Sequence, residues 1–329
     1  MNNIFVHKNN FDKYSNTKSV LLFGDVLACP NPLMTVIMPV YGNPKFFVHS
    51  FNSVINQKVD FEYEVIVVDN TPLDNNKSEV QKLIESTNLP NIIYYRNEEN
   101  IGMTGNWNRG IELARADLIT FCHDDDMLYP DCLSKLWDLH LKYPYKFIIP
   151  CQRNIDETVI YPLEDLPSKK LKGKECVPFK KLDIFMGNPT NGVGSLFYKK
   201  HMLELGGYNE EYYPSQDNAL HVLYVFKYGA VYYRRSLYCY RITSNNTSNK
   251  VYQGFINNSL FYGRCMAPLM RIPHFLQTML LHALEVKQTN IMERVWGGRQ
   301  NNAMGLTLCD NLVYIFLSFR NRLKNIGLY

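Results

Sequence analysis

The sequence lacks the features that mark membrane-spanning and exported proteins. In its 329 residues no apolar run approaches the roughly 20 residues that a helix needs to cross a bilayer. The longest candidates, residues 275–284 and 312–319, are short and interrupted. The first 14 residues are polar and hold no apolar core of a signal peptide. We therefore expect a cytoplasmic protein that does not cross a membrane.

Paired cysteines are also missing. The eight cysteines are scattered, with no C-x-x-C pair and no spacing of a zinc site. Several lie within apolar runs, where a free thiol behaves as a small hydrophobic group. This distribution is typical of a reducing compartment and again favours the cytoplasm.

A net positive charge is found only near the C-terminal end. Residues 250–329 contain nine Lys and Arg against three acids, a net charge of +6, whereas the whole chain carries only +4. A basic, helical and aromatic tail suits contact with an anionic membrane surface. The alternative is a helical cap that packs on the rest of the chain and supports a homodimer. The body is not basic and carries no nucleic-acid-binding motif, so we expect no nucleic-acid partner.

Strand-like and helical segments alternate over the first half of the chain. Strands are expected at residues 34–40, 63–68, 92–95 and 116–122. Helical spacing of apolar residues is found at residues 46–55, 78–86 and 107–114. This alternation predicts βαβ units and an α/β fold with a mostly parallel central sheet flanked by helices.

The pattern is less regular elsewhere. Residues 1–33 are a polar lead-in with one apolar patch at 20–23. Residues 152–180 resemble a loop that covers a site. Further helices are expected at 130–143, at 218–228 and from 253 onward, and further strands at 147–150, 194–198 and 230–233.

Three consecutive carboxylates, Asp124, Asp125 and Asp126, follow the strand expected at 116–122. Ligands of open α/β sheets bind beyond the carboxyl ends of the strands. Clustered carboxylates repel one another unless a cation joins them, and oxygen ligands favour Mg²⁺ or Mn²⁺ over Zn²⁺. Another strand ends at Asp69, where a carboxylate commonly accepts ribose hydroxyls. Together these strand ends predict a pocket for a nucleotide diphosphate with a divalent cation.

Both acidic positions also have a simpler interpretation. The triplet equally suits a turn that caps the helix starting near Pro130. Asp69 opens an Asp-Asn-Thr-Pro sequence, which is itself a good turn former.

Residues 34–248 resemble the inverting glycosyltransferase family 2, which has the GT-A fold. In the first half the matching motifs are Pro39-Val40-Tyr41, Val67-Val68-Asp69, Asn100-Ile101-Gly102, Asn106-Trp107-Asn108-Arg109-Gly110 and the acid triplet. In the second half they are residues 192–197, Leu205-Gly206-Gly207-Tyr208, Ser215-Gln216-Asp217 and Tyr240-Arg241-Ile242. Each motif is weak alone, but the set in this order and spacing is strong.

The resemblance implies a role for each candidate residue. Nucleotide and donor sugar would contact Pro39, Val40, Tyr41, Asp69, Asn100, Gly102, Asn106, Asp124 and Asp125. Asp126, with Asp124, would bind the Mn²⁺ or Mg²⁺ that bridges the two phosphates. Asp217 would be the catalytic base, taking a proton from an acceptor hydroxyl as that oxygen attacks the anomeric carbon with inversion. From the residues alone, Asp217 also suits the first turn of a helix with Ser215 as its N-cap.

Three positions depart from the family pattern. Gln216 stands where the family often has Glu, Thr243 where it often has a His near the metal or diphosphate, and His123 where many relatives have Asp. These departures leave open a catalytically silent module that binds nucleotide sugars without turnover.

The resemblance leads to one expected activity and one division of the chain. We expect a metal-dependent hexosyltransferase that moves a hexose or N-acetylhexosamine, most readily from a UDP-sugar, to a hydroxyl of a glycan or polyprenyl-diphosphate-linked acceptor. The setting would be bacterial surface polysaccharide synthesis (O-antigen or capsule) at the inner face of the cytoplasmic membrane. The lead-in (1–33) would precede a GT-A catalytic domain (34–248), made of a nucleotide-sugar half (34–133) and an acceptor half (134–248). A helical, basic extension (249–329) would follow.

Overall fold

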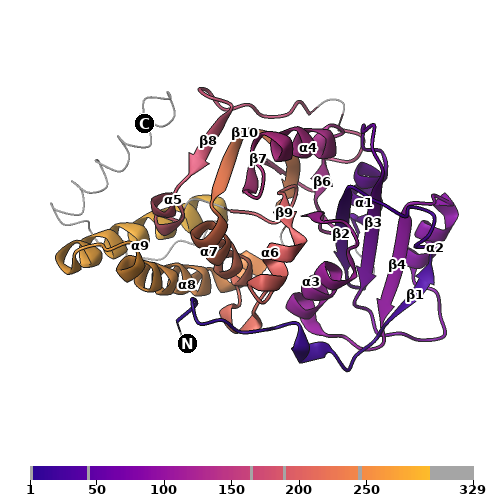
Figure 1. The fold of residues 1–329 in the computed structure, drawn as a ribbon, viewed down its shortest axis with the longest axis horizontal. Coiled ribbons are helices and arrows are strands. Elements are labelled where there is room, and N and C mark those ends of the chain that lie inside the picture. Colours follow the sequence, from indigo (N-terminus) through magenta and orange to yellow (C-terminus); the bar gives the residue numbers. More distant parts are fainter. Residues whose placement is uncertain (1–2, 43–44, 164–165, 188–189, 244–246, 297–329) are drawn as a thin grey trace.

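The computed structural model describes residues 3–42, 45–163, 166–187, 190–243 and 247–296, in which two sheets are flanked by helices (Figure 1). The strands are β1 (Ser19–Phe23), β2 (Met34–Val40), β3 (Tyr63–Asp69), β4 (Ile92–Asn97), β5 (Leu118–Phe121), β6 (Met127–Leu128), β7 (Phe147–Ile155), β8 (Cys176–Phe179), β9 (Phe197–Tyr198) and β10 (Ala230–Arg241). The α-helices are α1 (Phe47–Ile55), α2 (Glu79–Thr87), α3 (Gly102–Leu113), α4 (Cys132–Lys142), α5 (Lys181–Phe185), α6 (Lys199–Glu204), α7 (Gln216–Tyr228), α8 (Thr247–Leu269) and α9 (His274–Trp296). Short 3-10 turns lie at Asp12–Tyr14 and Glu210–Tyr212.

The six-stranded sheet has the order β1-β4-β3-β2-β5-β9. Its four central strands are parallel, and the edge strands β1 and β9 are antiparallel to their neighbours. Every residue of β2 and β3 is buried, as expected for parallel strands with helices on both faces. Along β2, Val36 and Met38 pack with residues of α1 and α4, whereas Ile37 packs with α3 on the other face. The expected α/β class is therefore confirmed.

The second sheet is built around β10, which lies between β6 and β7 and also pairs with β8. The strand expected at 230–233 is much longer, because β10 continues through Arg234 and Ser236 to Arg241. These polar residues remain buried because their backbone N–H groups donate to carbonyls of residues 175 and 169. The prediction of an irregular loop over 152–180 is therefore wrong at both ends of that segment. There β7 and β8 are regular strands, and backbone hydrogen bonds join the segment to β10.

The polar lead-in is tied to both halves of the molecule. Its apolar patch forms β1, which pairs with β4 at the edge of the sheet. Arg109 of α3 donates to the carbonyl oxygens of Tyr14 and Thr17 and to the hydroxyl of Ser19. Farther back, the amide of Asn10 donates to the carbonyl of Gly206 in the second half. This segment therefore belongs to the packed structure.

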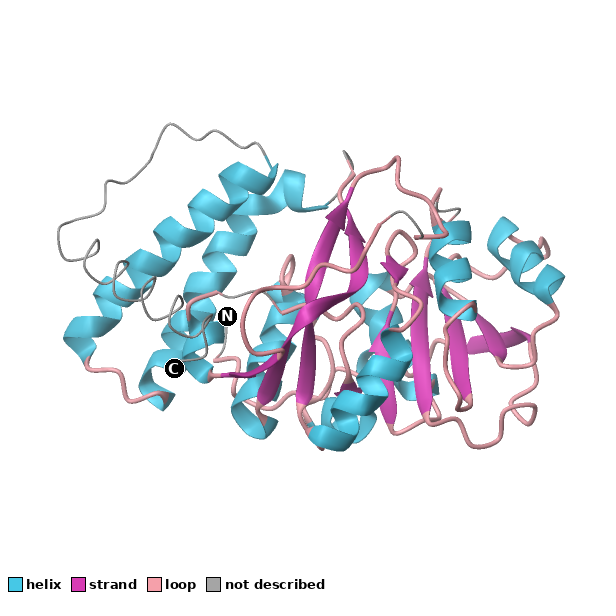
Figure 2. Cartoon of the chain, turned by 90° about the horizontal axis from the view of Figure 1, so that it is seen from above, coloured by secondary structure: helices cyan, strands magenta, loops and turns pink. Residues whose placement is uncertain are grey.

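The C-terminal helices α8 and α9 form an antiparallel pair at the end of the molecule opposite to β1 and α2 (Figures 1 and 2). The helical expectation is confirmed as far as residue 296. Of the nine basic residues on which the membrane expectation depends, four lie outside the described part of the chain, namely Arg299, Arg320, Arg322 and Lys324. Within the described part, no helix is long and apolar enough to span a bilayer.

Candidate active site

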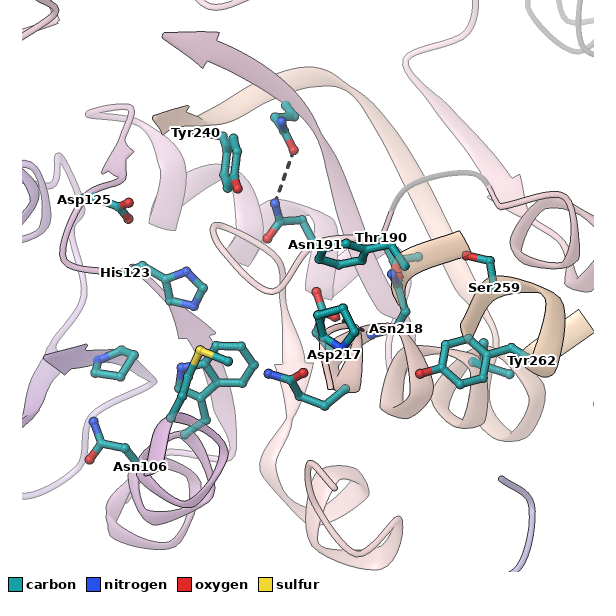
Figure 3. Close-up of a pocket in the computed structure, with 18 of the residues that line it drawn as sticks. Asn106, His123, Asp125, Thr190, Asn191, Asp217, Asn218, Tyr240, Ser259 and Tyr262 are labelled. Carbon is teal, nitrogen blue, oxygen red and sulfur yellow. Dashed lines mark hydrogen bonds between the residues drawn. The ribbon is translucent and has the colours of Figure 1, made fainter. Parts of the chain in front are cut away.

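A cavity of about 940 Å³ lies at the carboxyl ends of β2 and β5. One side is formed by Pro39, Val40, Tyr41, Asp124 and Asp125, and the other by α7 with the C-terminal helices (Figure 3). Nine of the eleven predicted site residues line it, namely Pro39, Val40, Tyr41, Asn100, Gly102, Asn106, Asp124, Asp125 and Asp217. Asp69 and Asp126 do not line it. The structure thus brings most of the predicted site together from positions far apart in the sequence.

The acid triplet forms a tight turn at the end of β5. Asp124 and Asp125 line the cavity, whereas Asp126 lies fully buried beneath them. Burial raises the pKa of all three carboxyls, and the charge of Asp125 adds to the effect on both neighbours. The pKa of Asp124 rises to about 7. Without a positive charge beside them, the three carboxyl groups are therefore not all ionised at neutral pH.

Asp126 is held by the backbone of β10 and not by a side chain. Its Oδ1 accepts from the backbone N–H of Arg241 at 3.0 Å. Its Oδ2 is buried without a hydrogen-bond partner, with Nδ1 of His123 at 3.6 Å. Among the described residues, no three His, Cys, Asp or Glu side chains converge to enclose a metal ion.

Arg241 locks the acid turn in place from behind. Its side chain is fully buried, and Nε donates to the carbonyl oxygen of Asp125 at 2.9 Å. Nη1 donates to the carbonyl oxygens of Asp156 and Val159, each at 2.7 Å. The guanidinium carbon also lies 4.2 Å from the ring centre of Phe46. Arg241 therefore supports the site instead of facing a ligand.

Asp69 is fully buried and satisfied by its neighbours. The hydroxyl of Tyr94 donates to its Oδ2 at 2.7 Å, and the backbone N–H of Thr71 donates to its Oδ1 at 2.9 Å. Both contacts shape the turn after β3. The turn-forming interpretation of Asp69 is thus present in the structure, while its expected contact with the nucleoside stays a prediction.

A chain of amide side chains connects the ends of the central strands. Asn97 donates to Oδ1 of Asn70 and of Asn106, and Asn106 donates to the carbonyl of Val68 at 2.9 Å. Asn70 in turn donates to Oδ1 of Asn100 at 2.7 Å. This network fixes the floor of the cavity on the side of the predicted nucleotide.

A stacked pair of aromatic rings forms part of the cavity wall. The indole of Trp107 stacks on the imidazole of His123, with ring centres 5.4 Å apart and planes inclined by 10°. Both residues line the cavity. Burial lowers the pKa of His123 to about 4, so the ring is neutral at physiological pH. Met103 lines the same wall. Neither Trp107 nor Met103 was predicted as a site residue, although Trp107 lies inside a family motif.

Asp217 lies in the first turn of α7 and faces the cavity (Figure 3). The backbone N–H of Asn218 donates to its Oδ1 at 2.8 Å. Burial raises the pKa of its carboxyl to about 6. Its negative charge contributes to a raised pKa in the phenols of Tyr208 and Tyr262. Asp217 therefore both lies at the start of a helix and faces the cavity.

Several further wall residues come from segments without any recognisable motif. From α8 and α9 they are Phe255, Ser259, Tyr262, Met266, Leu284 and Gln288. The segment 152–180, expected to cover the site, contributes only Gln152 among its described residues. Apolar residues on a helix indicate packing in general, so no local pattern distinguished these positions.

Comparison with known proteins agrees with this geometry. The model of glycosyl transferase family 2 matches residues 35–197. An uncharacterised protein of Mycobacterium tuberculosis is 26% identical over 196 residues, covering 56% of this chain and 60% of the relative. GalNAc(5)-diNAcBac-PP-undecaprenol beta-1,3-glucosyltransferase of Campylobacter jejuni is 28% identical over 242 residues, covering 68% of this chain and 72% of the relative. The matched region thus spans about three fifths to three quarters of these two proteins.

Solved structures share the fold at low sequence identity. S. aureus TarS 1–349 in complex with UDP-GlcNAc superposes with a TM-score of 0.53 and 14% identity, covering 80% of this chain and 81% of that one. Mannosyltransferase PcManGT from Pyrobaculum calidifontis, in complex with GDP-Man and Mn²⁺, gives a TM-score of 0.52 and 12% identity, with 97% and 89% covered. These likenesses show the expected GT-A type of fold. Since the family match covers the strands that carry the acid turn and the fold agrees, the chain belongs to glycosyl transferase family 2.

Proposed function

We propose that the protein is an inverting glycosyltransferase that moves a hexose or N-acetylhexosamine from a nucleotide diphosphate sugar to an acceptor hydroxyl. One observation carries the proposal: the acid turn and Asp217 line the same cavity from opposite sides. A donor sugar between them would have its leaving group near the acids and its opposite face toward Asp217. That arrangement suits attack with inversion at the anomeric carbon.

The donor would lie over the ends of the parallel strands. Pro39, Val40 and Tyr41 with Asn100, Gly102 and Asn106 line that end of the cavity, where open α/β sheets bind nucleotides. Asp69, buried behind them, would hold the turn that meets the base or ribose. A UDP-sugar is the donor we favour, supported by the UDP-GlcNAc bound to the structurally similar TarS.

The site would use Mn²⁺ or Mg²⁺. No Lys or Arg is found among the described residues that line the cavity, so the protein offers the diphosphate little positive charge there. Cations that serve phosphates are commonly held by only one or two carboxylates, with substrate and water completing the shell. Asp124, which meets the cavity, and Asp126, which has an unpartnered buried oxygen, fit such a cation. When bound, it would stabilise the negative charge of the leaving group.

Asp217 would act as the base. Its carboxylate would take the proton of the acceptor hydroxyl while the acceptor oxygen bonds to the anomeric carbon. The bond from that carbon to the phosphate oxygen breaks, and the nucleoside diphosphate leaves. A pKa near 6 keeps Asp217 ionised at neutral pH and more basic than an ordinary Asp. General bases of this kind contribute about 10²- to 10⁴-fold in rate.

The acceptor would be a glycan, free or linked to a polyprenyl diphosphate, in the synthesis of a bacterial surface polysaccharide such as O-antigen or capsule. The name of the Campylobacter jejuni relative, which acts on an undecaprenol-linked glycan, supports a lipid-linked acceptor. The protein would then work at the inner face of the cytoplasmic membrane. Its basic C-terminal residues would contact the anionic lipid surface.

The rival is a silent module that binds nucleotide sugars without turnover. Gln216 and Thr243, which lie in the cavity wall, favour this alternative.

A thermal-shift panel of UDP, GDP, CDP and dTDP, with and without Mn²⁺, tests nucleotide binding by the wild type and by Asp126→Asn. Asn keeps the oxygen that accepts from Arg241 but removes the charge. We expect one nucleotide to raise the melting temperature only with Mn²⁺ in the wild type, and not in the variant. No shift with any nucleotide in folded protein would overturn the proposal.

Turnover separates the enzyme from the module. Release of nucleoside diphosphate from the matching nucleotide sugars is measured with wild type and Asp217→Asn. We expect slow donor hydrolysis in the wild type, at least about 10²-fold slower in the variant, with nucleotide binding unchanged. Tight binding without hydrolysis or transfer would favour the silent module.

A further inference from the structure

We call the part of the cavity beyond Asp217 the helical recess. The side chains that line it give it a chemistry of its own. It is lined by Phe185 of α5, Gln216 of α7, Tyr262 and Met266 of α8, and Leu284 and Gln288 of α9. None of these six side chains is charged. The C-terminal helices, which lie outside the region matched by the family model, supply four of them.

The floor of the helical recess is apolar and almost fully buried. Phe185, Met266 and Leu284 are at most 1% exposed although they line the cavity. Side chains that expose so little surface offer contact to a small apolar group rather than to a whole sugar ring. Toward Asp217 the wall is polar and more accessible, because Asn218 and Ser259 line the cavity and are partly exposed (Figure 3). A sugar ring would therefore lie at the mouth, with a methyl-sized substituent directed inward.

One polar atom at the edge of the recess has no partner. Gln216 is 1% exposed, and its Oε1 makes no hydrogen bond within the described structure. A buried carbonyl oxygen without a hydrogen bond carries a free-energy penalty, because it has lost its bonds to water. A ligand with an N–H group at this position would remove that penalty. The neighbouring Tyr262 hydroxyl does not compete for it, since it donates to the carbonyl of Ser215.

These observations select one substituent class. We propose that the helical recess binds the acetamido group of an uncharged 2-acetamido sugar at the acceptor end, which deepens the proposed function and rests on it. The methyl group lies against Phe185, Met266 and Leu284, and the amide N–H donates to Oε1 of Gln216. A carboxylate or phosphate finds no cationic partner among the described residues of the cavity wall, and Asp217 repels it. Uronic acids and sugar phosphates are therefore excluded.

The test compares matched methyl glycosides by saturation-transfer NMR on the full chain with UDP and Mn²⁺ present. The probes are the methyl glycosides of 2-acetamido-2-deoxyglucose, 2-propionamido-2-deoxyglucose, glucose and glucuronic acid. We expect the acetamido sugar to bind roughly tenfold tighter than the other three, with the strongest transfer at its acetyl methyl group. A tenfold ratio corresponds to about 1.4 kcal/mol. Equal binding of the acetamido and propionamido sugars, or of the glucuronide, overturns the inference.

Two variants locate the preference. Gln216→Leu removes the unpartnered oxygen, and Met266→Phe fills the floor; each is expected to abolish the preference for the acetamido sugar. Gln253→Leu, the same change at an exposed position of α8, is the matched control and is expected to keep it. Preference that survives in both recess variants overturns the inference. UDP affinity and the melting temperature are measured on every variant to show that the fold and donor end are intact.

The same experiment distinguishes a failure of the proposed function from a failure of the recess assignment. If UDP with Mn²⁺ does not bind the wild type, the proposed function fails. If UDP binds but the acetamido sugar shows no preference, the recess assignment alone fails, and the wild-type comparison decides this even where a variant does not fold.

Discussion

The backbone N–H of Arg241 donates to Oδ1 of Asp126 over 3.0 Å, joining two residues that stand 115 positions apart in the chain. The side chain of the same arginine holds the carbonyl of Asp125 and those of Asp156 and Val159. The acid turn of the first half is therefore positioned by the last strand of the second. The end of the cavity that we propose binds the donor depends on a contact that only the complete fold supplies.

Replacing Arg241 with Lys should destabilise the protein by about 2–4 kcal/mol. Lysine keeps the positive charge, but its single ammonium group cannot serve three carbonyl oxygens that lie in different directions. Urea unfolding measures the change, with the exposed Arg264→Lys as control. Nucleotide affinity should fall as well, because the turn that carries Asp125 loses its support. Unchanged stability would show that the backbone alone holds the turn.

Asn106→Asp should destabilise by about 2–4 kcal/mol, because it points a carboxylate oxygen at the carbonyl of Val68, to which the amide now donates. Asn100→Asp is the matched control. Both contacts of Asn100 use its Oδ1 as acceptor, from the amide of Asn70 and the backbone N–H of Gly102, and Asp keeps such an oxygen. Chemical denaturation of the two variants should therefore differ clearly. Similar losses for both would contradict the assigned direction of the amide network.

The rate of transfer should fall on acidification below about pH 6. The pKa of Asp217 is raised to about 6 by burial, and only the ionised carboxylate can take the acceptor proton. We expect kcat/KM to drop about tenfold for each pH unit below that value. The profile is measured with a nucleotide sugar, whose diphosphate does not titrate in this range. A profile that stays flat to pH 4.5 would remove Asp217 from the role of base.

Asp217→Asn should abolish transfer and yet stabilise the fold above pH 6. The folded pKa lies above the ordinary value near 4, so the ionised carboxyl costs stability at high pH, and this cost disappears as the pH falls through 6. Two pKa units amount to nearly 3 kcal/mol, which partial exposure to the cavity reduces to about 1–2 kcal/mol. Urea unfolding at pH 8 should show the gain. The difference in free energy of unfolding between the variant and the wild type should shrink toward zero near pH 4.

Local sequence predicts the central strands well because two physical requirements agree there. Apart from Glu64 and Asp69 of β3, β2 and β3 consist of β-branched and other apolar residues, and both of their faces are covered by helices. Strand propensity and burial therefore point to the same segments. The sequence therefore predicts that Asp69, at the end of β3, and the acids that follow β5 lie at one edge of the sheet.

The start of α3 shows where local patterns fail. The helix was expected at Trp107 but begins at Gly102, and its first turns contain Gly102 and Gly105, which weaken helix propensity. The ring of Tyr14 packs so closely on Gly105 that a Cβ there would lie 2.8 Å from ring carbons. A distant contact thus favours glycine at a position where local propensity does not.

The same limit applies to the site. Asp69 and Asp126 resemble ligand-facing residues in sequence, but Tyr94 and Thr71 occupy the oxygens of the first, and the backbone of Arg241 one oxygen of the second. Conversely, Tyr262 and Met266 resemble ordinary helix-packing residues and yet line the cavity. Which face of a helix lines a cavity depends on how that helix packs against the rest of the protein. The local spacing of residues does not determine this packing.

The wall supplied by α7, α8 and α9 has a consequence for how this protein can diversify. The family match ends at residue 197, and all three helices are encoded after it. Since Arg241 of β10 holds the acid turn, the useful junction lies after it, where recombination would exchange α8 and α9, which supply most of the helical recess, and leave the strand ends, Arg241 and the acid turn unchanged. Related genes could in this way acquire new acceptors without rebuilding the donor end, and chimeric enzymes could be assembled at the same junction.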